Sequence, residues 1–596
     1  MAKDMKFAGA LILAVATAHV LYSQEPTPPQ PATDATAIQS NKSETEPKTE
    51  VSVQDTGNTF KLRVNLVQVH VIVRDNAGKP VEGLGKEDFQ LFDNGKLQPI
   101  STFAVESAQS RKERSEAAEK NQQNEEENAA GNSVTLPVRF VALTFDDVHL
   151  KMEDAGPLRA AAAQFVDAMA PADRVGLFST SGQFTLDFTN DKEALKRKLL
   201  GLLPRGQLNS STTECPNISY YMADQLEKEG WPPDPNHSGP PDFEVFVQET
   251  LRCMSGIEVT TARTLVISAA RRVLDVGEAE NRDTYRQLGS ALRTLSSKPG
   301  TRVLLLASPG FTLGTLTNEA SGIVDLANRA NIVINTLDAR GLYAPALGGD
   351  ISQPFSDAPS TIGLKASCRL AEQSDQQFVL MDLAFGTGGT FFHSNDFEAG
   401  LKQAGSAPEV SYVLGFSPQN QKMDGRYHTL KVTLPGKNKY AIQARRGYFA
   451  PQKLDDPGEI AKQEIQDAMF SQNEIFDLPL TLQTQYFKFD DTATGLSVVS
   501  HLDVQRMQFH KVDGRNFDDL TVATVIFDDN GKFVMGGEKL VKMRLLDSSI
   551  GRYGHTGFVV KSTFDLKPGK YMVRQVARDS EGAQMAARSA IVVIPN

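Results

Sequence analysis

Hydrophobic and polar residues alternate over the segment that begins at Phe60. In "FKLRVNLVQVHVIVRD", Leu62, Val64 and Leu66 lie on one face of an extended strand, and "DNAGKP" follows as a turn. In "DFQLFDNGKLQPISTF", two short runs flank the triplet DNG, which favours the positive φ angles of a hairpin turn. This pattern predicts a small β-domain over residues 60–106.

The middle of the chain changes to continuous apolar runs separated by helical patterns. "VRFVALTF", "DRVGLFSTSG", "TRVLLLASPGF" and "NIVINTLDA" have strand length, whereas "GPLRAAAAQFVDAM", "NDKEALKRKLLGLL" and "SGIVDLANRA" have helical spacing. Strands that alternate with helices are typical of a parallel sheet covered on both faces. We expect an α/β domain over residues 134–418, with an insertion near 205–258.

The pattern of strands and turns returns in the last third of the chain. We expect "SYVLGFSPQN" to close the α/β sheet, and "RYHTLKVTLPGKN" and "YAIQARRGYFAP" to form a β-extension over 419–454. A helical connector follows at 455–474. Residues 475–596 alternate strands with turn signals such as DNG and KPG, which predicts an immunoglobulin-like or fibronectin-like β-sandwich.

The N-terminus has the features of an export signal. A basic start, "MAKDMK", precedes the apolar run "FAGALILAVATA", and cleavage after Ala18 or Ser23 gives a signal peptide of residues 1–23; a short uncleaved anchor helix is the alternative. Residues 24–59 are rich in Pro, Thr, Ser and Glu, which predicts a disordered tether. Residues 107–133 carry mixed charges and are interpreted as a linker, with a partial surface helix as the alternative.

Length and charge limit the classes of function. A chain of 596 residues exceeds what one hydrophobic core usually organises, so several domains are expected. Its 62 Lys and Arg against 73 Asp and Glu give a net charge of −11, which argues against nucleic acid as a partner. No later apolar run reaches the roughly 18 residues of a membrane-spanning helix, so we expect no span after signal cleavage and a secreted or periplasmic location.

The three cysteines fit an oxidising compartment. Cys215 and Cys253 bracket a segment with "WPPDPNHSGPPD", which is too rich in Pro and Gly to hold itself together. A disulfide between them would stabilise the fold by about 4 kcal/mol on the chain-entropy model, with Cys368 left as the free thiol. Other pairings, or two buried thiols, are the alternatives.

Motifs of catalysis are absent from the sequence. It has no nucleophile elbow, zinc-binding helix pair or phosphate-binding loop, and "FGTGGTFF" is interpreted as a Gly-rich turn into a strand. Ser308 ends a predicted strand, but a nucleophile also needs a positioned base. We therefore expect a protein that is not an enzyme, and an exported hydrolase is the weakest of the alternatives.

Several phrases together resemble a known family. "FVALTFDDVHL", "DRVGLFSTSG" and "TRVLLLASPGF" look like successive pieces of a von Willebrand factor type A (VWA) domain. The phrases "VHVIVRDNAGKPVEGLGKEDFQLFDNGKLQPISTF", "CPNISYYMADQL" and "ARRGYFAP" resemble the acidobacterial VWFA-related family of exported proteins. This resemblance covers about residues 60–451. It implies a Rossmann-like α/β domain, flanked here by β-sandwiches, that binds protein partners, often through a metal ion.

The metal site that the resemblance implies is incomplete in this sequence. Asp146 matches the first Asp of the D-x-S-x-S motif, but Val148 and Leu150 replace its two serines. Thr213, or its neighbour Thr212, matches the Thr that metal-binding members of the family carry in a later loop. Ser308-Pro309-Gly310 is at the place of their T-D-G motif, so the Asp of that motif is missing. Apolar side chains cannot donate the oxygens that Mg²⁺ requires.

We therefore expect Asp146, Asp147 and Thr213 to be a vestigial metal set, with no cofactor beyond a weakly held divalent cation. Asp147 and His149 are the alternative for a transition metal, since carboxylate and imidazole suit such ions. If no metal binds, the two carboxylates are expected to lie solvated above the sheet or to cap the following helix.

The candidate partner-binding residues are His149, Ser308, Arg445, Arg446 and Tyr448. The last three are an exposed-looking cationic and aromatic cluster, for which cation–π packing between domains is the alternative role. The sequence favours an exported protein-binding or adhesion-type protein with a protein partner in the envelope or outside the cell. The alternative is a structural or assembly component of the envelope.

Overall fold

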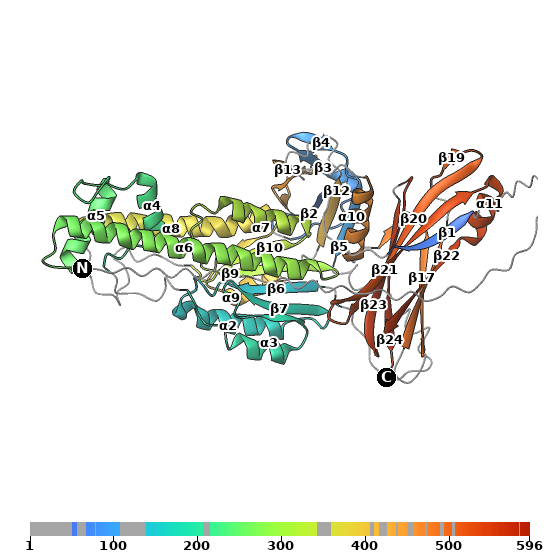
Figure 1. Cartoon of the computed structure of the whole chain (residues 1–596), viewed down its shortest axis with the longest axis horizontal. Coiled ribbons are helices and arrows are strands. Elements are labelled where there is room, and N and C mark those ends of the chain that lie inside the picture. The colour runs from blue at the N-terminus through green and yellow to red at the C-terminus, as the bar shows by residue number, and fades with distance from the viewer. Residues whose placement is uncertain are drawn as a thin grey trace, which may run out of the picture. The chain divides into compact units, whose positions relative to one another are not determined.

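The computed structural model describes most of the chain from residue 50 onward (Figure 1). The described ranges are 50–56, 67–77, 79–107, 137, 139–206, 215–342, 359–405, 410–416, 426–436, 439–450, 457–470, 474–488, 494–503, 507–582 and 584–595. The predicted signal peptide, nearly all of the predicted linker, and both Thr212 and Thr213 lie outside these ranges.

A six-stranded sheet lies at the centre of the α/β part. Its strands are β6 (Arg139–Phe145), β7 (Asp173–Ser179), β8 (Leu186–Thr189), β9 (Thr301–Ser308), β10 (Val333–Asp338) and β11 (Phe391–Phe392). Their order is β11-β10-β9-β6-β7-β8. All neighbours are parallel except β8, which is antiparallel to β7. The predicted parallel sheet is confirmed.

Helices cover both faces of this sheet. One face packs against α2 (Met152–Asp167), α3 (Lys192–Leu199) and α9 (Phe397–Gly405), and the other against α6 (Val259–Ser296), α7 (Thr317–Arg329) and α8 (Pro359–Gly386). Successive side chains of β6 point to opposite faces, so that Val141 enters the first core and Phe140 the second. This explains why the strands have continuous apolar runs rather than alternating ones.

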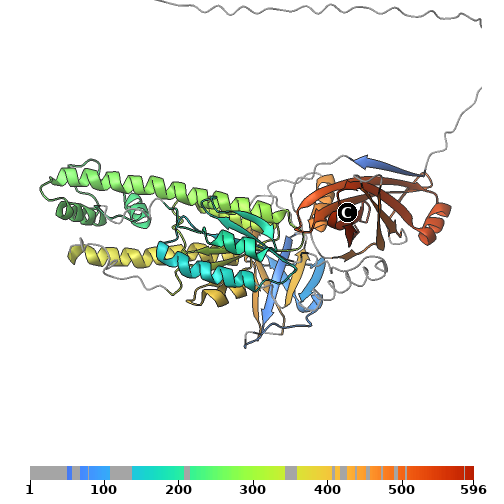
Figure 2. The same ribbon diagram turned by 90° about the horizontal axis from the view of Figure 1, so that it is seen from below.

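Two further helices, α4 (Tyr220–Glu229) and α5 (Pro241–Cys253), pack against α6 and α8. Helix α6 is about 57 Å long at 1.5 Å per residue, against about 26 Å for the strand β9 that follows it. Because the end of α6 leads into the start of β9, the first part of α6 extends past the carboxyl ends of the strands. Figures 1 and 2 show α4 and α5 beside the far ends of α6 and α8. We call residues 215–274 and 359–378 the helical projection.

The helical projection has a core of its own, which corrects the expectation that this segment cannot hold itself together. The buried core residues are Ile218, Met222, Ala223, Leu226, Phe243, Phe246, Val247, Ala262, Val266, Ala270 and Val273. Pro240 and Pro241 begin helix α5, where a proline costs no hydrogen bond. The prolines therefore start a helix here instead of preventing one.

The small β-domain is built from two distant parts of the chain. One sheet has the order β14-β2-β12-β5 and the other the order β15-β13-β3-β4. The bounds are β2 (Val67–Arg74), β3 (Gln90–Asp93), β4 (Lys96–Gln98), β5 (Thr102–Ser107), β12 (Val410–Phe416), β13 (Tyr427–Thr433), β14 (Ala441–Ala444) and β15 (Gly447–Phe449); a short 3-10 helix η1 (Lys86–Asp88) precedes β3.

The expectation that "SYVLGF" closes the α/β sheet was wrong. This strand, β12, pairs antiparallel with β2 and β5, and Tyr412 lies opposite both Val71 and Val105. Tyr412 is fully buried, and its hydroxyl donates to the Val81 carbonyl at 2.7 Å. An apolar strand next to an α/β domain suits either sheet, and only the antiparallel partners provided by residues 67–107 decide between them.

Two sheets packed face to face form the C-terminal part. Helix α10 (Pro457–Phe470), in the predicted connector, packs against the larger sheet. Helix α11 (Asp547–Thr556) follows β21 and precedes β22 in the sequence. The strands are β1 (Val51–Thr56), β16 (Ile475–Phe476), β17 (Leu480–Lys488), β18 (Thr494–Leu502), β19 (His510–Val512), β20 (Arg515–Asp528), β21 (Phe533–Leu545), β22 (Phe558–Leu566), β23 (Gly569–Asp579) and β24 (Met585–Ile594). The larger sheet runs β1-β21-β20-β23-β24-β16, with β19 beside β20, and the smaller runs β17-β18-β22.

Strand β1 corrects the predicted tether. Residues 51–56, placed in the disordered segment 24–59, form an edge strand antiparallel to β21. The Thr-rich and Glu-rich composition of residues 24–59 does not indicate a strand, because residues 51–56 are ordered by backbone pairing with residues 538–543, far along the chain. In the part of the chain covered by the structure, no helix is long and apolar enough to cross a membrane.

Candidate functional site

Polar side chains gather where β6, β7 and β9 end. Asp146, Asp147 and His149 follow β6, Thr180 and Ser181 follow β7, and Ser308 is the last residue of β9. We call these six residues the strand-end cluster. The carboxyl ends of parallel strands meet at one edge of a sheet, which brings the residues together. The predicted grouping of Asp146, Asp147 and Ser308 is therefore present, and Thr180 and Ser181 are members that the sequence reasoning missed.

Asp146 is a fully buried acceptor of hydrogen bonds. Thr180 donates its hydroxyl to Oδ1 at 2.8 Å and Ser308 to Oδ2 at 2.6 Å, while His149 Nδ1 lies 2.9 Å from Oδ1. Burial by itself raises the pKa of this carboxyl, but the charge of His149 and these hydrogen bonds outweigh it and lower the pKa. Asp146 is thus held as a carboxylate by its own chain.

His149 supplies the positive charge of the cluster. Its Nε2 lies 2.8 Å from Asn281 Oδ1, and the amide nitrogen of Asn281 donates to the Thr312 carbonyl at 2.7 Å. That second bond fixes the amide, so both imidazole nitrogens face acceptor oxygens and both must donate. Burial lowers the pKa of His149, but Asp146 outweighs it and raises the pKa. The ring also stacks on Phe311, with centroids 5.1 Å apart.

Asp147 is equally buried; it shares the Thr180 hydroxyl with Asp146, at 3.3 Å, and has further partners of its own. Ser181 donates its backbone N–H at 2.8 Å and its hydroxyl at 2.6 Å, and the guanidinium of Arg205 lies 3.6 Å away. The expectation that the two carboxylates lie solvated or cap a helix was wrong, because helix α2 begins after Lys151 and receives no side-chain cap. A basic side chain does meet Asp147, but it comes from this chain.

The remaining positions of the degenerate motif belong to the core. Leu150 is fully buried and Val148 is nearly so, and both are apolar where a metal-binding domain would place hydroxyls. Among the described residues, no group of three or more His, Cys, Asp or Glu side chains could hold a metal ion. Asp146 has donors where a cation would lie, so the residues present do not fit a divalent ion.

A third buried carboxylate, which the sequence motifs did not indicate, ends strand β10. Asp338 is fully buried, and Arg340 donates to both of its oxygens at 3.0 Å. Gln377 of helix α8 donates to the same carboxylate at 3.3 Å, and Arg340 also donates to Gln376 at 2.7 Å. The sequence signal that could have indicated Asp338 is its position at the end of the predicted strand "NIVINTLD". Arg340 and Asp338 tie this strand end to α8.

Ser308 lacks the arrangement of a nucleophile. It is fully buried, it donates its proton to Asp146, and its oxygen accepts the N–H of Gly310 at 2.9 Å. His149 directs its ring nitrogens to Asp146 and Asn281 instead of to Ser308. Serine and histidine thus share one carboxylate, whereas nucleophilic activation requires a bond from the hydroxyl to the base. A fully buried Ser308 also cannot contact a partner directly.

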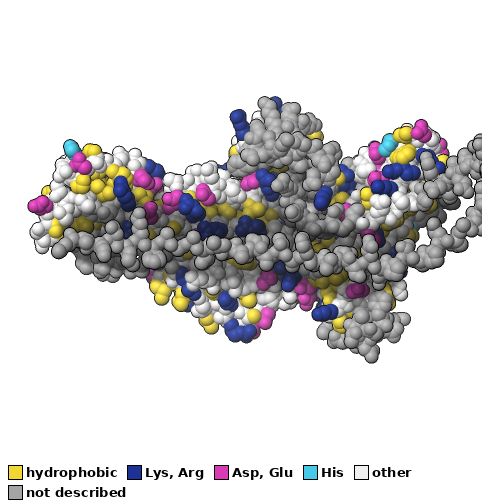
Figure 3. Space-filling view, viewed as in Figure 1, with side chains coloured by type: hydrophobic (Ala, Val, Ile, Leu, Met, Phe, Trp, Pro, Cys, Tyr) yellow, Lys and Arg dark blue, Asp and Glu magenta, His cyan; other side chains and the backbone are white. Residues whose placement is uncertain are grey.

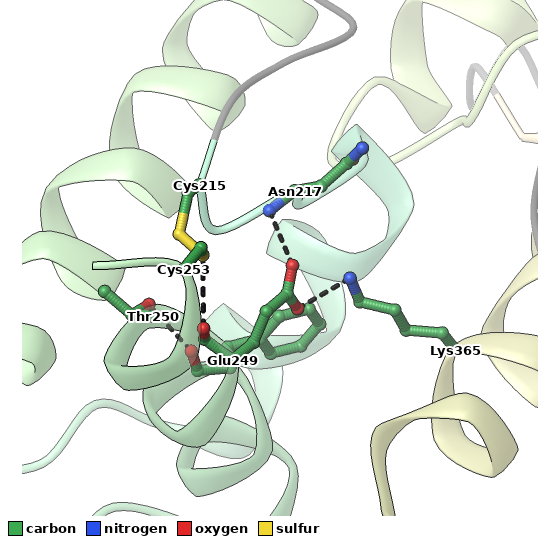
Figure 4. Close-up of a disulfide and its surroundings, with 7 residues drawn as sticks. Cys215, Asn217, Glu249, Thr250, Cys253 and Lys365 are labelled. Carbon is green, nitrogen blue, oxygen red and sulfur yellow. Dashed lines mark hydrogen bonds and ion pairs between the residues drawn. A yellow bond between two sulfur atoms is a disulfide. The ribbon is translucent and has the colours of Figure 1, made fainter. Parts of the chain in front are cut away.

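The helical projection is held by a disulfide and a buried ion pair (Figure 4). The predicted Cys215–Cys253 disulfide is confirmed, and Cys368 is free. Glu249 of α5 and Lys365 of α8 form an ion pair of 2.6 Å, with side chains only 1% and 2% exposed. Glu249 also accepts the N–H of Asn217 at 3.1 Å. The carboxylate therefore joins α5, α8 and the segment that carries the disulfide.

Glu372 adds a buried carboxyl to the same helices. Burial raises its pKa to about 7, although a hydrogen bond from the Ser219 hydroxyl, 3.1 Å away, opposes the shift. Ser219 is also the N-cap of α4, where its hydroxyl accepts the N–H of Met222. One serine side chain thus links the start of α4 to α8.

Arg445, Arg446 and Tyr448 have different environments. Arg445 and Tyr448 are 6% and 5% exposed, so the exposed cluster suggested by the composition is wrong for these two. Burial lowers the pKa of Arg445 to about 10. Tyr448 donates to Asp93 at 3.0 Å inside the β-domain. Arg446 lies over the Phe385 ring of α8 at 4.9 Å, which is the cation–π packing offered as the alternative.

Comparisons with known proteins give little. No family model matches the chain, and no curated protein matches it. The conserved hypothetical protein BatB from Bacteroides thetaiotaomicron has 14% identity and a TM-score of 0.18, over 45% of this chain and 96% of BatB. A beta-glucuronidase 2 from Bacteroides uniformis has 10% identity and a TM-score of 0.13, over 31% of this chain and 19% of the enzyme. Scores this low support no inference about fold or function.

Proposed function

We propose that this is an exported protein-binding protein of the adhesion type, with a VWA-like α/β domain whose metal site is degenerate and an immunoglobulin-like C-terminal sandwich. The helical projection is the part that contacts the partner. The observation that carries this proposal is the combination of a rigid projection with exposed hydrophobic side chains. The disulfide supports a location in the periplasm or outside the cell, because such bonds persist in oxidising compartments.

The exposed hydrophobic residues lie at two places on the projection. Leu370 and Phe378 are 47% and 55% exposed and lie two turns apart along one side of α8. Met254 and Val259 are 38% and 42% exposed and flank the turn between α5 and α6. Figure 3 shows hydrophobic side chains over α4 and α5. Rigid helices that present such residues bind at low entropic cost, since little is ordered on association.

Capture of partners from envelope fractions tests this proposal. We expect the double variant Leu370→Ser/Phe378→Ser to capture about one tenth or less of the cross-linked partner that the unchanged chain captures. The reason is that exposed aromatic anchors contribute most to interfaces. Val559→Ser is the matched control, since Val559 is 64% exposed on β22 of the C-terminal part. Equal loss with the control, or no loss with the double variant, would refute a role for the projection.

A structural or assembly component is the second candidate. Arg174 of the α/β sheet is 3% exposed and donates to the carbonyl of Asp529 at 2.8 Å and to Asn530 Oδ1 at 3.2 Å, in the β20–β21 turn. Gly300 also donates its N–H to the Phe470 carbonyl at 3.1 Å. These bonds support an α/β domain that holds the β-domains together. Partner capture that persists after removal of the whole α/β domain would favour this candidate.

A further inference from the structure

Strand β1 occupies an unusual place in the chain. Its six residues, Val51–Thr56, precede the small β-domain in sequence but complete the edge of the C-terminal sheet. Each residue from Val51 to Thr56 lies opposite one residue of β21, from Met543 back to Glu538. The acceptor strand, β21, is 13 residues long. The edge of this sheet is therefore covered by a short segment from the other end of the chain.

Few side chains hold β1 in place. Ser52, Gln54 and Asp55 are exposed, and Val53 is 54% exposed. Among the residues of the strand whose side chains the structure describes, 51–55, Val51 is the one that packs against the core beneath β21. Most of the attachment is thus backbone pairing, which any copy of the same strand can make. Such a strand can leave without opening the hydrophobic core.

The edge of β21 is complementary in charge to this strand. Residues 50–56 carry Glu50 and Asp55 and have no basic residue. Lys539 forms an ion pair with Asp55 at 2.7 Å, whereas Arg544 meets Glu50 only through a backbone hydrogen bond of 2.8 Å and places its guanidinium against Asp519. Lys542 lies opposite Ser52. The acceptor edge therefore favours an acidic extended segment in this register.

We propose that β21 is a strand-acceptor site that takes residues 51–56 of a second copy of this chain. Release of β1 exposes a row of unpaired N–H and C=O groups on β21, which is a template for another strand. The same strand from a second copy restores every bond, so exchange changes little in the contact energy. Because each copy has one donor strand and one acceptor edge, exchange links copies in a dimer or in a series.

Disulfide trapping between two different copies tests the exchange. The donor is the full mature chain with Gln54→Cys, and the acceptor lacks residues 50–56 and carries Leu540→Cys; both carry Cys368→Ser. Gln54 and Leu540 lie directly opposite each other, a spacing that suits a disulfide. We expect the mixed dimer to form at least about tenfold faster than with a control acceptor, because pairing raises the effective concentration of the two thiols.

The control acceptor carries Lys561→Cys, at an exposed position of β22 in the other sheet. A third acceptor keeps residues 50–56 together with Leu540→Cys, and we expect its rate to fall between the other two because its own strand competes. Thermal melting shows whether the shortened acceptor folds. Should both Leu540→Cys acceptors react no faster than the control, β1 pairs only within its own chain and the proposal is overturned.

Discussion

Two buried ion pairs in the α/β part differ in the cation that neutralises the carboxylate. Asp146 and His149 lie 2.9 Å apart in the strand-end cluster, and Glu249 and Lys365 lie 2.6 Å apart in the helical projection. A histidine ordinarily titrates near neutral pH, whereas a lysine does so far above it. The His149 side chain is also 18% exposed, against 2% for Lys365. The strand-end cluster can therefore respond to pH through His149.

The largest effect is expected when the pair in the projection is broken. Lys365→Met leaves the carboxylate of Glu249 buried without a cation, which should lower the free energy of unfolding of the projection by about 3–5 kcal/mol. Trp231 is the single tryptophan of the chain and lies in the projection. Chemical denaturation followed by tryptophan fluorescence thus reports this part directly.

The matched control for this variant is Glu249→Gln/Lys365→Met, which removes both charges. We expect it to regain most of the lost stability, because the main cost of the single change is the unpaired charge. A single variant that unfolds within about 1 kcal/mol of the unchanged chain would contradict a structural role for this ion pair.

The pair in the strand-end cluster should make stability depend on pH. Since folding raises the pKa of His149, its contribution is complete below the unfolded pKa of about 6.5 and disappears as pH rises through the folded pKa. Folding lowers the pKa of Asp146, so its contribution is present above about pH 3.8 and disappears as pH falls through the folded value. The pair therefore stabilises the fold most between these limits.

Calorimetric melting from pH 5 to 9 measures this dependence. Above pH 6.5 we expect the free energy of unfolding to fall, with a slope that approaches about 1.4 kcal/mol per pH unit between the two pKa values of His149. His149→Gln should reduce that slope and keep a neutral hydrogen-bonding side chain, and the raised pKa of Glu372, about 7, accounts for the slope that is left near neutral pH. A slope that is unchanged in His149→Gln would assign the pH dependence to another group.

The smallest effect is expected from divalent metal ions. Because His149, Thr180 and Ser308 already fill the oxygens of Asp146, calorimetric titration of the chain without its predicted signal peptide with Mg²⁺, Mn²⁺ or Ca²⁺ should show no binding in the micromolar range. Asp146→Asn is the matched variant and should give the same trace. Micromolar binding that this variant abolishes would place the protein with metal-dependent adhesion domains instead.

The sequence predicted the helices and strands and several residues of the strand-end cluster, but not the hydrogen-bond partners or the charge of those residues. It placed Asp146, Asp147 and Ser308 at strand ends, because the carboxyl ends of parallel strands share one edge. It did not place Thr180 or Asn281, which reach Asp146 and His149 from other elements. Asp146 raises the pKa of His149 most, and Asn281, 132 residues away, adds a hydrogen bond to the ring that no local pattern indicates.

The sequence by itself determined the parts that depend on local periodicity and covalent chemistry. Apolar runs separated by helical spacing predicted the parallel sheet and its helices, and two cysteines around a Pro-rich segment, in a chain predicted to be exported, pointed to the disulfide. Tertiary structure alone decided where ambiguous strands pair. Strand β12 joins β2 and β5, and β1 joins β21, because backbone hydrogen bonds are the same for any partner. Distant segments must come together before the fold decides which sheet edge stays free and which strand covers which apolar face.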